Sequence, residues 1–143
     1  MNLNFVFDSE KVSRELKKVQ KSMTGQIDRA LLQTAQFGTQ LILDRTAKGE
    51  GYTGGSFGAY NPKYALFRKA KGRQVSPVDL NFSGKMLGSM ASAKVKSGVA
   101  KIYFTRATEA KKAAMNDAKR PFFGFGKLEQ ERLRKFFIGR IKL

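Results

Sequence analysis

The sequence predicts an α+β fold in which an antiparallel β-sheet packs with a long N-terminal helix and a C-terminal helix. Apolar residues recur at helical spacing before residue 47 and again after residue 128. Two stretches of alternating polarity flank Ser97-Gly98, as in a hairpin. Five glycines within residues 49–58 predict a long Gly, aromatic and basic loop between the first helix and the sheet.

Chain length and composition favour a single folded unit. With 143 residues, the chain is long enough for one hydrophobic core and too short for two, so we expect one domain over residues 1–143. The formal net charge of +17 indicates a negatively charged partner. Nucleic acid, an anionic membrane and an acidic protein surface all remain open, as does a basic surface that serves only solubility.

The sequence contains neither cysteine nor histidine. Their absence removes thiolate chemistry, the commonest general base and the commonest transition-metal ligand. We therefore expect no cofactor and no metal. The N-terminal residues do not resemble a secretory signal, and no stretch approaches the roughly 20 apolar residues that span a bilayer. A soluble protein without membrane contact is expected.

The first half of the chain contains the clearest helical pattern. Residues 3–7 alternate like a short strand and precede two possible helix caps, Asp8 and Ser9. Apolar residues then recur at helical spacing until a basic turn and a glycine end the helix near Ala47. This pattern predicts one long helix, which Gly25 could kink or split.

Residues 48–77 are predicted to form a long loop with one short helix after Pro62, because proline suits the first helical position. We expect this loop to become ordered on assembly, since its aromatic side chains need a surface to pack on. Its rings and cations could follow a nucleic-acid backbone, or anchor a protein interface. The candidate interface or DNA-facing residues are Phe57, Tyr60, Lys63, Tyr64, Phe67, Arg68, Lys69, Lys71 and Arg73.

The second half of the chain predicts shorter elements. Ser83 can cap a helical turn, and residues 91–106 predict the hairpin. Thr108 can cap a short helix. Residues 119–124 are predicted to end this helix and to form an extended or turn segment. A final helix over about residues 128–141 has acidic residues in its first turn and basic residues late, as the helix dipole favours.

A glycine-rich motif, Gly49-Glu-Gly51-Tyr-Thr-Gly54, has the spacing of a dinucleotide-binding loop. Such a loop follows a strand and opens a helix, whereas this one follows a helix and precedes more glycine. We interpret it as part of the loop rather than as a nucleotide site.

An acidic pair with a lysine provides the enzyme alternative. Asp79, followed later by Glu109 and Lys111, imitates the carboxylates and lysine of metal-dependent nucleases. The helical pattern around Glu109 and Lys111 instead favours a solvated helix face, so we expect no catalysis.

Four segments occur in an order that resembles one protein family. They are Phe57–Ala65 (FGAYNPKYA), Pro77–Leu80 (PVDL), Ser83–Leu87 (SGKML) and Lys119–Gly124 (KRPFFG). Together they resemble the virion morphogenesis or tail-completion family of tailed bacteriophages, from about residue 30 to residue 135. Asn61 and Ser83 stand where members of that family often have Ser and Thr.

The resemblance implies a structural virion protein of the neck or tail end, acting in tail completion, tail termination or head-tail joining. It implies a six-fold ring that contacts its own copies, connector and tail-tube proteins, and the double-stranded DNA that passes through. Localisation would be the virion, after synthesis in the bacterial host cytoplasm. Residues of the matching motifs with an implied structural role are Asp79, Leu80, Gly84, Arg120, Pro121, Phe122, Phe123 and Gly124.

Two questions stay open within this interpretation. The resemblance implies that four residues fix the approach of the last helix to the sheet: Arg120, Pro121, Phe122 and Phe123. As large aromatic residues, Phe122 and Phe123 are themselves more typical of simple core packing than of a partner contact. A sequence-independent DNA-binding protein is the alternative function.

Overall fold

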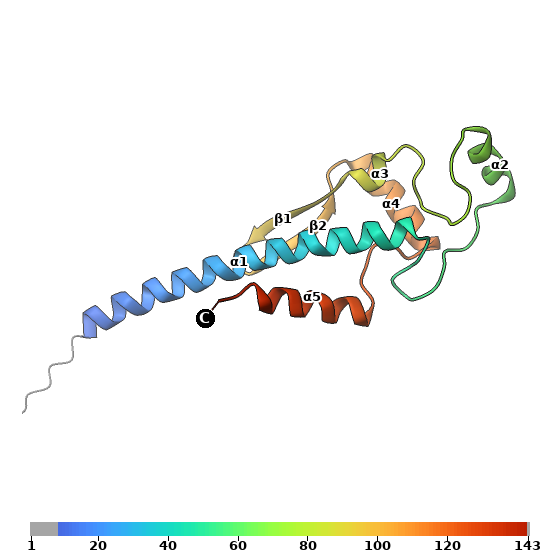
Figure 1. The fold of residues 1–143 in the computed structure, drawn as a ribbon. Helices are drawn as coiled ribbons and strands as arrows, with labels where there is room; N and C mark the ends of the chain where they lie inside the picture. The colour runs from blue at the N-terminus through green and yellow to red at the C-terminus, as the bar shows by residue number, and fades with distance from the viewer. Residues whose placement is uncertain (1–8, 143) are drawn as a thin grey trace, which may run out of the picture.

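The computed structural model describes residues 9–142, and it has the predicted α+β architecture (Figure 1). A long N-terminal helix, a two-stranded antiparallel sheet and a C-terminal helix are all present in this range. The predicted strand over residues 3–7 and the Asp8 cap lie outside the described residues. The elements are α1 (Ser9–Ala47), α2 (Pro62–Ala70), α3 (Lys85–Gly88), β1 (Met90–Lys96), β2 (Val99–Phe104), α4 (Ala107–Lys119) and α5 (Lys127–Gly139).

Helix α1 is the axis of the molecule. Its 39 residues correspond to a length of about 58 Å. The helix continues through Gly25, so the predicted split does not occur. Its C-terminal half packs against the hairpin on one side and α5 on the other, while its N-terminal half projects beyond both (Figure 1).

The hairpin follows the prediction closely. Ser92 pairs with Ile102, and Met90 pairs with Phe104 at the open end. Gly98 turns the chain with a φ of 79°, in the left-handed region that favours glycine. The tip is fixed to α1 because Asp28 accepts a hydrogen bond from the Gly98 amide (2.8 Å) and lies 2.7 Å from the Lys94 ammonium.

The hydrophobic core lies where the C-terminal part of α1 meets α3, α4 and the two segments that flank α2. Phe122 has no exposed surface, which confirms core packing for this residue. Phe123 is partly buried, with its ring 5.1 Å from that of Phe104. The buried cluster consists of Ile42, Tyr60, Val78, Leu80, Met86, Ala113 and Phe122.

The helix starts in the second half differ in detail from prediction. Helix α4 begins at Ala107, because the Ala110 amide already donates to the Arg106 carbonyl (2.9 Å). The predicted Thr108 cap is therefore wrong. The Ser83 hydroxyl does accept a hydrogen bond from the Lys85 amide (3.4 Å), and Gly84 at the start of α3 has a φ of 79°.

The segment between α1 and α3 is fastened to the rest of the chain. The predicted helix after Pro62 is confirmed as α2, with the Asn61 side chain accepting a hydrogen bond from the Lys63 amide (3.0 Å). Before it, the Tyr52 amide donates to the Pro121 carbonyl (3.1 Å). Gly49 has a φ of +76°, and a Cβ there would lie 2.7 Å from the Pro77 Cβ. Ordering of this segment on assembly stays a prediction.

Candidate assembly and nucleic-acid interface

A buried arginine organises the candidate site. The Arg68 side chain is only 1% exposed although it comes from the predicted surface loop. Its Nε donates to the Gln74 carbonyl (2.7 Å), and its Nη2 donates to the Asp79 carboxylate (3.0 Å) and to the Asn81 carbonyl (2.9 Å). The expectation that Arg68 meets a partner or DNA is therefore corrected, because its donors hold α2 against the following segment.

Tyr60 is the second residue predicted at the surface that proves to be buried. Its ring centre lies 4.5 Å from the Arg68 guanidinium, and its hydroxyl accepts a hydrogen bond from the Leu80 amide (3.1 Å). Burial raises the pKa of the Tyr60 hydroxyl, so the group stays protonated at neutral pH. That hydroxyl also lies 3.5 Å from the Asp79 carboxylate. Tyr60 therefore joins two of the motif segments instead of facing a partner.

Arg120 joins a third motif segment to the same cluster. Its Nε donates to the Gly58 carbonyl and its Nη2 to the Ala59 carbonyl, both at 2.9 Å. Its guanidinium lies 5.2 Å from the Tyr60 ring centre, on α2's side of the core. Arg120 thus fastens the loop before α2, which corrects the expectation that it fixes the approach of the last helix.

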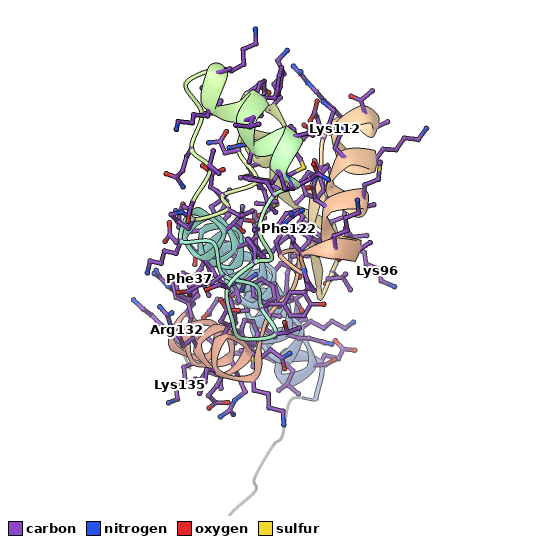
Figure 2. The ribbon with its side chains drawn as sticks, turned by 90° about the vertical axis from the view of Figure 1, so that its right-hand side faces the viewer. Phe37, Lys96, Lys112, Phe122, Arg132 and Lys135 are labelled. Atoms are coloured by element: carbon purple, nitrogen blue, oxygen red, sulfur yellow. The ribbon has the colours of Figure 1, made fainter. Side chains whose placement is uncertain are left out.

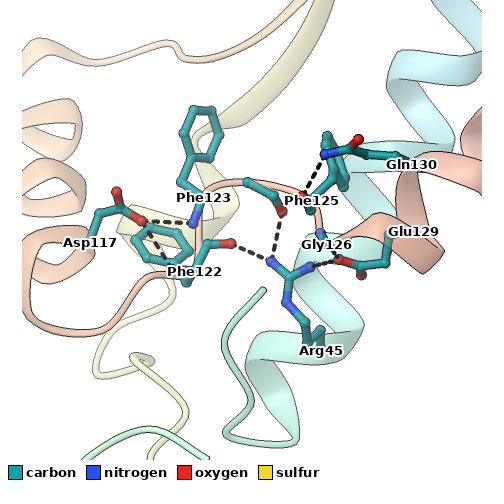
Figure 3. A network of polar contacts seen from close by, with 9 residues as sticks. Arg45, Asp117, Phe122, Phe123, Phe125, Gly126, Glu129 and Gln130 are labelled. Carbon is teal, nitrogen blue, oxygen red and sulfur yellow. Dashed lines mark hydrogen bonds and ion pairs between the residues drawn. The ribbon is translucent and has the colours of Figure 1, made fainter. Parts of the chain in front are cut away.

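The approach of the last helix depends on Arg45 (Figure 3). This α1 side chain donates hydrogen bonds to the carbonyls of Phe122 and Gly124 and pairs with Glu129 in the first turn of α5. Glu129 also accepts a hydrogen bond from the Gly126 amide (3.1 Å). One arginine therefore ties α1, the Arg-Pro-Phe-Phe-Gly segment and α5 together.

The Arg-Pro-Phe-Phe-Gly segment is held from its other side by Asp117 on α4. The Asp117 carboxylate accepts hydrogen bonds from the amides of Phe122 (3.0 Å) and Phe123 (2.9 Å) (Figure 3). A Cβ at Gly124 would lie 2.7 Å from the Tyr52 ring. The roles of Arg45, Asp117 and Glu129 were not predicted from the sequence, because no local pattern indicates that these charged residues share one network.

Most of the remaining loop candidates are exposed on α2 or in the turn that follows it. Tyr64 and Phe67 are stacked at 6.2 Å, and Phe67 stacks on Phe82 at 5.7 Å. Phe57 differs, because it packs on the buried core. The exposed residues define what we call the α2 face: Lys63, Tyr64, Phe67, Lys69, Lys71 and Arg73.

A cavity of about 560 Å³ lies between the inner side of α2 and helices α3 and α4. Glu109 lines it and is buried, so the expectation of a solvated helix face is wrong for this residue; Lys111 is exposed. Glu109 pairs with Lys112 (3.2 Å), as Asp79 pairs with Arg68. Within residues 9–142, no three side chains of the His, Cys, Asp or Glu types gather as a potential metal site.

No family model matches the chain, and comparisons with curated proteins and with solved structures give no match either. None of the helices in the described part of the chain is long and apolar enough to cross a membrane. The phage resemblance consequently depends on the four motif segments, on their order and on the contacts between them.

Proposed function

We propose that the protein is a structural subunit of the neck or tail end of a tailed bacteriophage, where it assembles into a ring around the DNA path. The observation that carries this proposal is the convergence of the motif segments. Three residues from different segments lie together at the end of the core where Arg68 is buried. They are Tyr60 from the first segment, Asp79 from the second and Arg120 from the last. This convergence supports treating the separate segments as one structural unit.

The exposed surfaces of the chain fit a subunit of an assembly. Stacked rings on the α2 face, together with Leu66 beside them, leave apolar surface open in the single chain. Apolar surface of this kind marks interaction sites in soluble proteins. The net charge of +17 supports a ring whose lumen or mating surface faces DNA or acidic neighbours.

In this role the protein works by position rather than by catalysis. The network of Arg45, Asp117 and Glu129 holds α1, α4 and α5 as one rigid body. That body presents the α2 face to a neighbouring subunit or ring. Lys and Arg contact phosphates without reading bases, which suits DNA that passes through in any sequence.

A phage that carries a nonsense codon in this gene tests the proposal. We expect filled heads and separate tails in the lysate, and restored particles when the wild-type protein is supplied from a plasmid. Immunogold labelling should place the protein at the junction of complete particles. Normal yields of infectious tailed particles without the protein would overturn the proposal.

A sequence-independent DNA-binding protein is the second candidate. The observation that favours it is the combination of four basic residues with two exposed rings on the α2 face. This function predicts that an isolated monomer binds duplex DNA tightly and loses affinity steeply with salt, because phosphate contacts release counterions. A salt series of duplex titrations separates it from a ring subunit with little affinity for free DNA.

A further inference from the structure

One carboxylate oxygen at the cavity between α2, α3 and α4 is buried without a hydrogen bond. Glu109 lines this cavity and is only 4% exposed. Its Oε1 pairs with the Lys112 ammonium at 3.2 Å, whereas its Oε2 has no hydrogen-bond partner among the described residues. Buried polar atoms of folded proteins nearly always have such a partner. Glu109 therefore offers an acceptor to a ligand that carries a hydrogen-bond donor.

Helix α4 contributes one side of its surface to the cavity. Glu109, Lys112 and Lys119 lie along this side, since they are three and seven residues apart. In Figure 2, Lys112 is labelled where α4 stands beside α2. Both lysines line the cavity and are exposed, whereas Glu109 is buried. The α4 side thus combines a buried acceptor with two cations that remain in contact with solvent.

Three aromatic rings contribute a second wall. Tyr60, Tyr64 and Phe82 line the cavity, and Tyr64 is 40% exposed. Aromatic side chains of proteins bind nucleobases by stacking on their flat faces. The cavity volume of about 560 Å³ lies within the range of small-molecule sites. The rings and the volume together suit a ligand that contains a planar ring.

The charges around the cavity narrow the class of ligand further. Among the described residues that line it, one carboxylate, that of Glu109, stands against four cationic side chains: Arg68, Lys112, Lys119 and Arg120. Asp79 compensates only the first of these. A purely cationic ligand, such as a lysine or arginine side chain of a partner, would be repelled by the remaining positive charge. A simple anion would leave the Glu109 Oε2 without a donor. The ligand that fits carries donors on a planar ring and a negative charge elsewhere.

We propose that this cavity binds a nucleotide, with the base against the aromatic rings and Glu109 and the phosphate at Lys112 and Lys119. The Glu109 Oε2 then accepts an N–H of the base, as carboxylates do from base amino groups. Guanine suits this acceptor best, because its ring N–H and its amino group are adjacent donors. Thymine has a single N–H between two carbonyl oxygens, which a carboxylate repels. This inference goes beyond the proposed ring and does not depend on it.

Isothermal titration calorimetry of the full chain tests the site. Deoxyguanosine monophosphate should bind more tightly than deoxythymidine monophosphate, deoxyguanosine or inorganic phosphate, because it alone supplies both the paired donors and the charge. Glu109→Gln should weaken its binding at least about tenfold, the loss of one hydrogen bond to a charged group. The preference for guanine over thymine should disappear in the same variant.

Two lysine variants form a matched pair. Lys119→Ala should weaken binding of deoxyguanosine monophosphate and leave binding of deoxyguanosine unchanged, because the nucleoside has no phosphate. Lys111→Ala removes an exposed lysine of α4 that does not line the cavity, and it should change neither affinity. Thermal melts show whether each variant folds. If Glu109→Gln does not fold, the lysine pair still decides the proposal, since both lysines are exposed.

Several results would overturn the proposal. They are wild-type affinity for deoxyguanosine monophosphate in folded Glu109→Gln or in Lys119→Ala, equal affinity for the guanine and thymine nucleotides, and no nucleotide binding at millimolar concentration. Binding of inorganic phosphate or of an arginine amide as tightly as the guanine nucleotide would overturn it as well, because either ligand lacks one half of the recognised chemistry.

The same chemistry is present in a free nucleotide and in the unpaired last nucleotide of a DNA strand. An oligothymidine strand that ends in guanosine, compared with one of thymidine alone, distinguishes these sources. Tighter binding of the guanosine-ended strand than of the free nucleotide identifies a strand end, and weaker binding identifies the free nucleotide. None of these titrations depends on ring formation, so failure of the nucleotide site leaves the proposed junction role standing.

Discussion

The Arg68 guanidinium and the Asp79 carboxylate form an ion pair at 3.0 Å, in which the arginine is almost completely buried. The pair links α2 to the segment before α3. A buried charge is stable only when a partner and hydrogen bonds compensate it. The position of the α2 face therefore depends on Arg68 and Asp79, which are not part of that face.

Asp79→Asn should destabilise the protein by about 3–5 kcal/mol, because it leaves the buried guanidinium uncompensated. Chemical denaturation followed by circular dichroism measures this loss. Glu131→Gln is the matched control, since it breaks the solvent-exposed pair with Arg134 and should leave the denaturation midpoint nearly unchanged. Equal effects of the two substitutions would show that burial of the first pair has been misjudged.

Phe122→Ala should cost about 3–5 kcal/mol, since the substitution leaves a cavity in a fully buried site. Phe123→Ala should cost less, because Phe123 is only partly buried and lines an open apolar groove between α1, β2 and α5. Unfolding free energies of the two variants give the comparison. A loss below about 1 kcal/mol for Phe122→Ala would contradict the core described above.

Replacement of Lys69, Lys71 and Arg73 by Gln should weaken assembly or DNA contact without unfolding the domain. All three side chains are exposed on the α2 face, where each substitution should change stability by less than about 0.5 kcal/mol. Melting temperature, sedimentation and duplex titration of the triple variant check both parts. A triple variant that melts far below the parent would refute the surface assignment.

The contact between the hairpin tip and α1 should weaken in acid. The hydrogen bond with Lys94, followed by that from the Gly98 amide, holds the pKa of Asp28 below its ordinary value. A lowered pKa means that the contribution to stability is present above the unfolded-state pKa and is lost as pH falls through the folded-state pKa. Asp28→Asn removes this dependence, so the difference in melting temperature between wild type and variant should shrink as the pH falls. A difference that stays constant across this acid range would contradict the assignment.

The elements that were predicted well depend on local sequence signals. The apolar spacing of α1, the turn at Ser97-Gly98 and the proline at the start of α2 each act within a few residues. The details that failed depend on neighbours. Helix α4 starts before Thr108 because a backbone carbonyl already accepts the first helical hydrogen bond.

The interior of the candidate site could not be predicted in the same way. Arg68 and the exposed Lys69 are neighbours on the same helix, so local sequence does not distinguish them. The buried charge of Arg68 is compensated by Asp79 and by two backbone carbonyl groups. Glu109 is also buried, beside α3, and its ion-pair partner is Lys112 of the same helix. Arg45 and Glu129 are far apart in the chain, so nothing in either segment indicates the other.

Native mass spectrometry of the purified full chain, with and without a short DNA duplex, tests the central claim most directly. A ring subunit should form a closed oligomer of defined stoichiometry, and the isolated monomer should bind the duplex weakly. A chain that stays monomeric at every concentration and binds the duplex tightly, with an affinity that falls steeply as salt is raised, would contradict the proposed ring.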